Sequence, residues 1–86
     1  MTDSFRHVSN SILRRTLEAP TRRVKTGELR QALTMTVESL GYDVINDQVS
    51  SSVLLSRTVA AREAMEALHK HQRARCHAAL RKFWLA

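Results

Sequence analysis

Apolar residues recur at helical spacing in the first part of this 86-residue chain. Between residues 3 and 19 they lie three, four or one positions apart, which predicts a helix with a narrow apolar stripe. The stripe consists of Phe5, Val8, Ile12, Leu13 and Leu17. Asp3 or Ser4 is the expected N-cap. Pro20 should end the helix, because the residue before a proline is disfavoured in the α conformation.

A second helix is predicted from Thr26, a suitable capping residue, to Gly41, a suitable left-handed residue after its last turn. Its apolar stripe is Leu29, Ala32, Leu33, Val37 and Leu40. The signal weakens over residues 42–57, where β-branched residues and three consecutive serines occur. A short third helix over about residues 46–56 is the reading we adopt, and a loop is the alternative.

Residues 58–86 read as one uninterrupted amphipathic helix. At about 100° per residue, its core face comprises Ala61, Ala64, Met65, Leu68, Cys76, Ala79 and Phe83. Its polar side comprises Arg62, Glu66, Lys70, Arg73, His77 and Arg81, with Leu80 and Trp84 among them. Such a rod would be about 40 Å long, whereas a compact domain of this size is about 30 Å across. The helix must therefore break or extend onto a second molecule, with the boundary expected near Gln72 and Arg75.

These elements predict an all-α fold, a small bundle of three to four helices in one domain over residues 1–86. Two glycines and one proline in the whole chain leave little material for tight hairpins. Cys76 is the single cysteine, which excludes an internal disulfide and favours a reducing, cytoplasmic location. No stretch is long and apolar enough for a membrane span or a secretion signal.

The net charge of +6 is unevenly distributed along the chain. Residues 1–30 carry 7 basic and 3 acidic groups, residues 31–56 carry 3 acidic groups and no basic one, and residues 57–86 carry 7 and 2. A basic molecule with one acidic side is expected to bind a polyanion or an acidic protein surface.

The sequence contains few features that indicate catalysis or metal binding. The potential ligands His69, His71, Cys76 and His77 include no pair at the i, i+4 spacing that places two ligands on one helix face. Cys76 lies on the apolar face, where a free cysteine behaves as a small hydrophobic residue. The carboxylates are scattered, and no glycine-rich phosphate loop exists. The expectation is a protein that is not an enzyme and that has no metal, cofactor or small-molecule substrate.

A helix-turn-helix centred on Gly41 is disfavoured. It would place Asp47 and Ser50 where the second helix needs apolar residues, and that helix would have no basic residue before Arg57. A ribbon-helix-helix is weaker still, because no strand of alternating apolar residues precedes the second helix.

Two basic clusters are the candidate binding residues. One surrounds the first interhelical linker and contains Arg14, Arg15, Arg22, Arg23, Lys25 and Arg30. The other lies on the last helix and contains Lys70, Arg73, Arg81 and Lys82, with His69 and His77 beside them. Such clusters neutralise phosphates without reading a base sequence. The leading hypothesis is thus a small basic regulator that contacts nucleic acid or a nucleoprotein complex.

The alternative is a protein-binding inhibitor or adaptor, of the kind found among small phage and plasmid accessory proteins. It would dock through Leu80, Phe83 and Trp84, because Trp flanked by Arg is common in protein-binding hot spots. The same residues would also support a homodimer through the C-terminal helix. A third account has the first helix fold across Leu80 and Trp84 and cover them.

Overall fold

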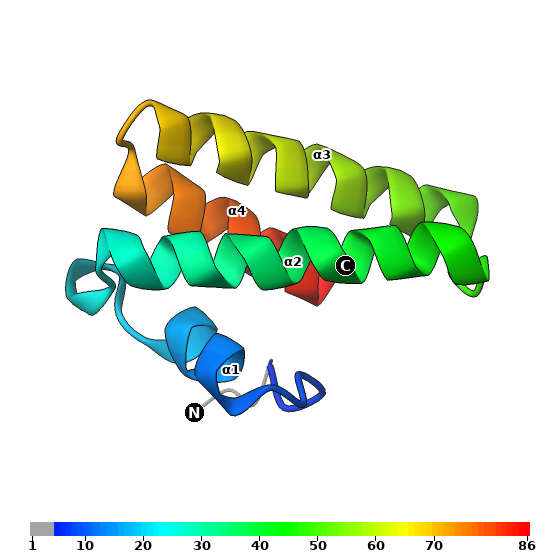
Figure 1. Cartoon of the computed structure of the whole chain (residues 1–86), viewed down its shortest axis with the longest axis horizontal. Coiled ribbons are helices and arrows are strands. Elements are labelled where there is room, and N and C mark those ends of the chain that lie inside the picture. Colours follow the sequence, from blue (N-terminus) through cyan, green and yellow to red (C-terminus); the bar gives the residue numbers. More distant parts are fainter. Residues whose placement is uncertain (1–4) are drawn as a thin grey trace.

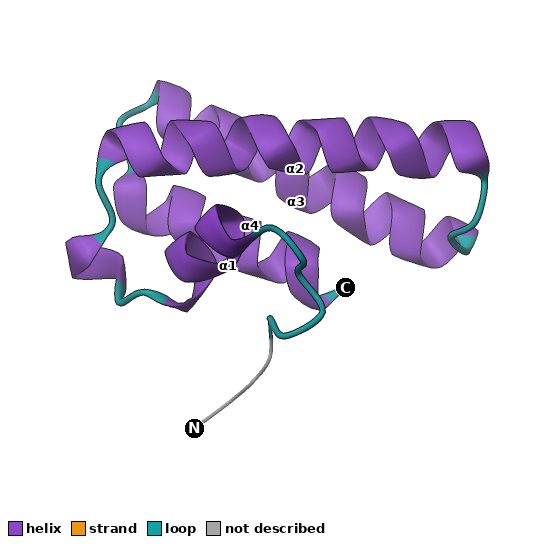
Figure 2. Cartoon of the chain, turned by 60° about the horizontal axis from the view of Figure 1, so that its bottom comes forward, coloured by secondary structure: helices purple, strands orange, loops and turns teal. Residues whose placement is uncertain are grey.

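The chain folds into a bundle of helices, which confirms the predicted all-α class (Figures 1 and 2). The computed structural model describes residues 5–86. Its elements are α1 (Ser11–Glu18), the 3-10 turn η1 (Thr21–Arg23), α2 (Thr26–Asn46), α3 (Ser51–His69) and α4 (Arg73–Leu85). The molecule measures 35 × 30 × 17 Å. Helices α2 and α3 form a long antiparallel hairpin, α4 folds back along α3, and α1 lies beside α2 and α4. Within residues 5–86, no helix is both long and apolar enough to cross a membrane.

The first helix is shorter than predicted. It begins at Ser11, because the Asn10 side chain caps it by accepting a hydrogen bond from the Leu13 backbone N–H at 3.0 Å. The predicted caps Asp3 and Ser4 lie outside the described residues. The predicted end before Pro20 is confirmed, since Ala19 is already extended.

Two predictions for residues 41–56 were wrong: the end of the second helix at Gly41 and a separate third helix over about residues 46–56. Helix α2 runs straight through Gly41 to Asn46, because a glycine within a helix costs only about 1 kcal/mol and the flanking residues propagate the helix. Asp47 supplies the left-handed residue instead, with φ of 51°. Ser50 then caps α3, so residues 46–56 form the hairpin turn and the start of α3, not a separate helix. This also removes the helix-turn-helix centred on Gly41.

The long C-terminal helix breaks in two, which corrects the prediction of one uninterrupted element. His71 adopts a left-handed conformation with φ of 59°. The backbone N–H of Gln72 donates to Ala67 O at 2.8 Å, and that of His71 donates to Leu68 O at 3.1 Å. These two bonds are those of a Schellman motif, which ends α3 and lets α4 turn back. Because the helix breaks, its two halves pack side by side within one chain, and no single rod longer than the domain is formed.

The core lies where α1, α2 and α4 meet α3. Alanines on α3, including Ala60, Ala64 and Ala67, face α4 and allow the two helices to approach closely. Three residues assigned to apolar stripes are exposed instead: Ile12 by 50%, Val37 by 40% and Met65 by 52%. Helical periodicity identifies an apolar side of a helix, but it does not say whether another helix covers that side.

Candidate anion-binding site

Basic side chains from two distant parts of the sequence line one surface depression of about 550 Å³. Arg22, Arg23 and Lys25 come from η1 and the start of α2, and Arg73 comes from the start of α4. The sequence assigned these residues to two separate clusters. The break between α3 and α4 joins them, because it brings the first turn of α4 next to η1.

Local structure holds this depression in shape. The Arg73 guanidinium donates a hydrogen bond to the Val24 carbonyl, which ties α4 to the segment that follows η1. The Glu28 carboxylate accepts a hydrogen bond from the Lys25 backbone N–H at 2.9 Å and so fixes the entry into α2. Both α2 and α4 begin at the depression, so the positive ends of two helix dipoles add to its basic side chains.

His77 supports the depression from inside the core, although the sequence placed it on the solvated face of α4. It is fully buried. Its Nε2 lies 2.8 Å from the Thr16 carbonyl, and its Nδ1 lies 2.8 Å from Thr21 Oγ1. A carbonyl only accepts, so Nε2 carries the proton and Nδ1 accepts from the Thr21 hydroxyl. Burial, and secondarily the charge of Arg81, lower the pKa of His77 below its ordinary value, against the hydrogen bond to Thr16.

The other predicted basic residues lie elsewhere. Arg30 lines a second depression between α2 and α3, together with Arg62, His69 and His71. Lys70 forms an i, i+4 ion pair with Glu66 at 3.1 Å, which lowers the pKa of that carboxyl. Arg81 stacks over the Phe5 ring, with its guanidinium carbon 5.5 Å from the ring centroid. Lys82 lies beside α3 near Glu63, and Arg14 and Arg15 lie on α1.

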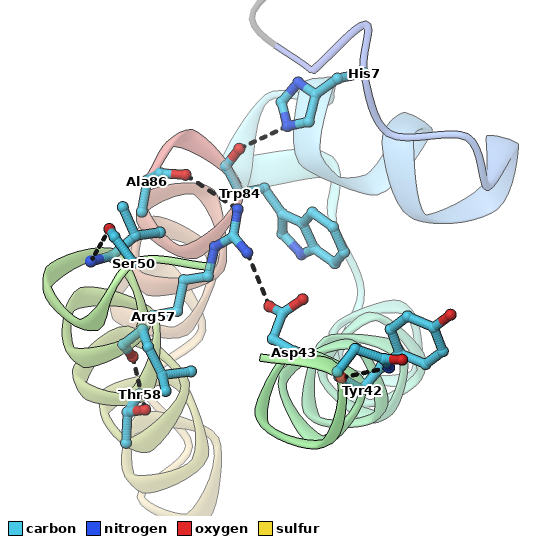
Figure 3. A network of polar contacts seen from close by, with 11 residues as sticks. His7, Tyr42, Asp43, Ser50, Arg57, Thr58, Trp84 and Ala86 are labelled. Carbon is cyan, nitrogen blue, oxygen red and sulfur yellow. Dashed lines mark hydrogen bonds and ion pairs between the residues drawn. The ribbon is translucent and has the colours of Figure 1, made fainter. Parts of the chain in front are cut away.

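Leu80, Phe83 and Trp84 do not form an exposed interface. Leu80 and Phe83 are almost completely buried, and Trp84 packs against the same core. Residues from the N-terminal segment and α1 lie in this core with Leu80, as the covering account predicted. The Trp84 indole donates to Thr36 Oγ1 at 3.0 Å. His7 Nε2 lies 2.8 Å from the Trp84 carbonyl (Figure 3). Docking or dimerisation through these three side chains would require the bundle to open.

Cys76 is fully buried, which confirms its assignment to the core, and burial raises the pKa of its thiol. A thiol in this environment is a poor nucleophile. Within residues 5–86, no three histidine, cysteine or carboxylate side chains come together as metal ligands.

No protein-family model, no curated protein and no solved structure matches this chain. The geometry of its own surface is therefore the basis for inferring its function.

Proposed function

We propose that this protein is a non-enzymatic regulator that binds nucleic acid through the phosphate backbone. The observation that carries the proposal is the convergence of Arg22, Arg23, Lys25 and Arg73 on one depression. Bringing like charges together costs free energy unless an anion neutralises them. Such a cluster on a protein of net charge +6 favours a polyanionic partner.

The form of the site favours phosphate contacts without base reading. Arg22, Arg23 and Lys25 are exposed, and they flank a short turn and two helix N-termini. Arginine and lysine at such positions contact phosphate oxygens and fix the orientation of a protein on nucleic acid. Arg22 and Arg23 lie in the 3-10 turn η1 and Lys25 precedes the first turn of α2, so these three cations do not form a row along a recognition helix. Binding should therefore depend strongly on salt and weakly on sequence.

An acidic protein surface is the second candidate partner, because the same cations would attract carboxylates. The release of condensed counterions distinguishes the two, since it gives nucleic-acid binding a linear dependence of log K on log salt. We favour nucleic acid, because all four cations open onto one solvent-accessible depression whose apolar lining residue, Val24, is almost completely buried and offers no anchor.

The test compares two double variants that remove the same charge. R22Q/R23Q neutralises the depression, and R62Q/K82Q neutralises exposed cations on α3 and α4 outside it. Fluorescence anisotropy with a mixed-sequence duplex and a mixed-sequence single strand is measured over a salt series. R22Q/R23Q should lower the salt slope by about 2, whereas R62Q/K82Q should leave it nearly unchanged.

Two results would overturn the proposal. One is the absence of binding to either nucleic acid at low salt. The other is an equal loss in both double variants, which would mean that net charge alone attracts the probe.

A further inference from the structure

A groove with exposed apolar residues along it runs between α2 and α3. On α2, Leu33, Val37, Leu40 and Val44 follow one another at spacings of four, three and four residues. On α3, Leu54, Thr58, Ala61, Met65 and Leu68 follow at spacings of four, three, four and three. Alternating spacings of three and four are typical of helices that pack along a seam against further helices.

Part of each stripe lies in the core, since Ala61 and Leu40 belong to the cluster around Phe83 of α4, and Leu33 and Leu68 pack against the main core cluster. The other apolar members remain at the surface. Val44 is 58% exposed and Met65 is 52% exposed. Leu33, Met65 and Leu68 also line an open depression of about 790 Å³ at one end of the groove. Apolar side chains aligned in this way on a monomer indicate an interaction surface.

The two ends of the groove carry opposite charge. The end at the start of α2 has Arg30, Arg62, His69 and His71 around the depression, and its one carboxylate, Glu66, is paired with Lys70. At the hairpin end, Asp43 is already paired with Arg57 at 2.8 Å. Asp47, at the hairpin turn, is exposed. A partner that fits this face therefore has an apolar stripe with an acidic end and a basic end, in the reverse order.

We propose that a second copy of this chain occupies the groove, with the two α2–α3 hairpins packed face to face and antiparallel in a four-helix arrangement. The chain itself carries the required stripe and the required order of charges. A two-fold axis across the middle of the groove places each basic end on the partner's acidic end. The resulting contact is isologous, which is the commonest symmetry of soluble dimers. This inference is independent of the proposed nucleic-acid binding.

The register of the hairpin predicts which residues meet. Two contacts give the register of the hairpin, since Asp43 pairs with Arg57 and Leu33 lines the same depression as Leu68. The α2 stripe begins at Leu33 and ends at Val44, so its centre lies near residues 38–39. A two-fold axis at that level brings Arg30 close to Asp47 of the partner subunit. This contact occurs twice in the dimer.

The first experiment measures association by sedimentation equilibrium of the nucleic-acid-free protein. Val44→Glu places a charge in the groove, and Tyr42→Glu is the matched control. Tyr42 is 67% exposed on the same helix, and two residues turn its side chain about 200° away from that of Val44. Val44→Glu should raise the dimer dissociation constant at least about tenfold, a loss of about 1.4 kcal/mol. Tyr42→Glu should change it by less than about twofold. Circular dichroism verifies that both variants remain folded.

The second experiment tests the antiparallel orientation. R30E and D47K should each dimerise more weakly than the natural sequence, because each creates two like-charge contacts. An equimolar mixture should recover association, since both contacts in the mixed dimer pair opposite charges. A natural protein that remains monomeric up to about 1 mM would overturn the proposal and leave a foreign helix as the occupant. Dimers that respond equally to Val44→Glu and Tyr42→Glu, or that show no recovery on mixing, would overturn the face or the orientation.

Discussion

The two ends of the α2–α3 hairpin differ in how they are built. At the basic end, η1 and the starts of α2 and α4 meet, and polar contacts through His77 and Arg73 connect them. At the hairpin end, two helices run on to the turn at Asp47, and exposed apolar residues such as Val44 and Ile45 remain. An ion pair joins Arg57 of α3 to Asp43 of α2 there, at 2.8 Å.

The two ends therefore present two kinds of surface, one basic and one apolar. At the basic end, hydrogen bonds within the chain satisfy the buried polar groups, and the cations of the depression are exposed. The hairpin end lacks a third helix over one face, so its apolar stripe is available to a partner. A domain of this size buries only about 60–65% of the surface of its unfolded chain, and association adds to that burial.

The largest predicted effect contrasts buried and exposed apolar residues at the two ends. Leu80 is fully buried among α1, α2 and α4 residues, so Leu80→Ala should lower the free energy of unfolding by about 3 kcal/mol. Val44→Ala at the hairpin end should cost less than about 1 kcal/mol in the monomer. Urea denaturation followed by circular dichroism measures both at one protein concentration. Similar losses for the two variants would contradict the division into a closed end and an open end.

The next effect concerns the ion pair at the hairpin end. Asp43 and Arg57 have side-chain exposures of 16% and 22%, so the pair is partly desolvated. Arg57 also donates to the Ala86 carbonyl at 3.2 Å and so connects α3 to the end of α4 (Figure 3). Asp43→Ala should lower the free energy of unfolding by about 1–2 kcal/mol. Asp43→Asn, which retains an acceptor oxygen, should recover part of that loss. Equal losses would show that the charge, not the hydrogen bond, carries the effect.

Trp84 lies between the two ends, and its removal should have a smaller effect. Trp84→Phe retains an aromatic ring beside Phe83, whose centroid lies 5.1 Å away, but removes the hydrogen bond to Thr36. Thr36 still donates to the Ala32 carbonyl at 2.7 Å, so its hydroxyl keeps one partner. The loss should be about 1 kcal/mol. A double-mutant cycle with Thr36→Val separates the hydrogen bond from the packing, and a coupling energy near zero would show that the bond contributes nothing.

The fold class follows from apolar periodicity, but the position of the break between α3 and α4 does not. His71 is an unusual residue for a left-handed position after a helix, where glycine is the common signal. Sequence periodicity continues across it, so residues 58–86 read as one helix. The sequence did identify Gln72 as an interruption of the apolar face, and α4 begins directly after it.

The break between α3 and α4 also explains why the sequence did not predict the burial of His77 and Leu80 or the grouping of Arg73 with Arg22 and Arg23. A continuous helix would carry His77 and Leu80 on a polar face, whereas in the folded chain α4 has α3 on one side and α1 on another. Arg73 joins Arg22 and Arg23 because of that same reversal. The basic residues were identifiable from the sequence, but their grouping depends on contacts between distant segments, which composition and spacing do not encode.

The smallest effect we predict is a pH dependence of the closed basic end. Because the pKa of His77 is lowered in the folded protein, the unfolded chain binds a proton more readily than the folded one. Stability should therefore decline as the pH falls through the ordinary histidine value of about 6.5 and should level off below the lowered pKa. The decline should be modest, because the Thr21 hydroxyl can reverse its role and accept from a protonated Nδ1. Urea denaturation between about pH 8 and pH 5 measures it, with His77→Gln as the control that lacks the titrating group. If the natural protein and His77→Gln have the same slope over this range, another group carries the pH dependence, and His77 does not control the stability of this end.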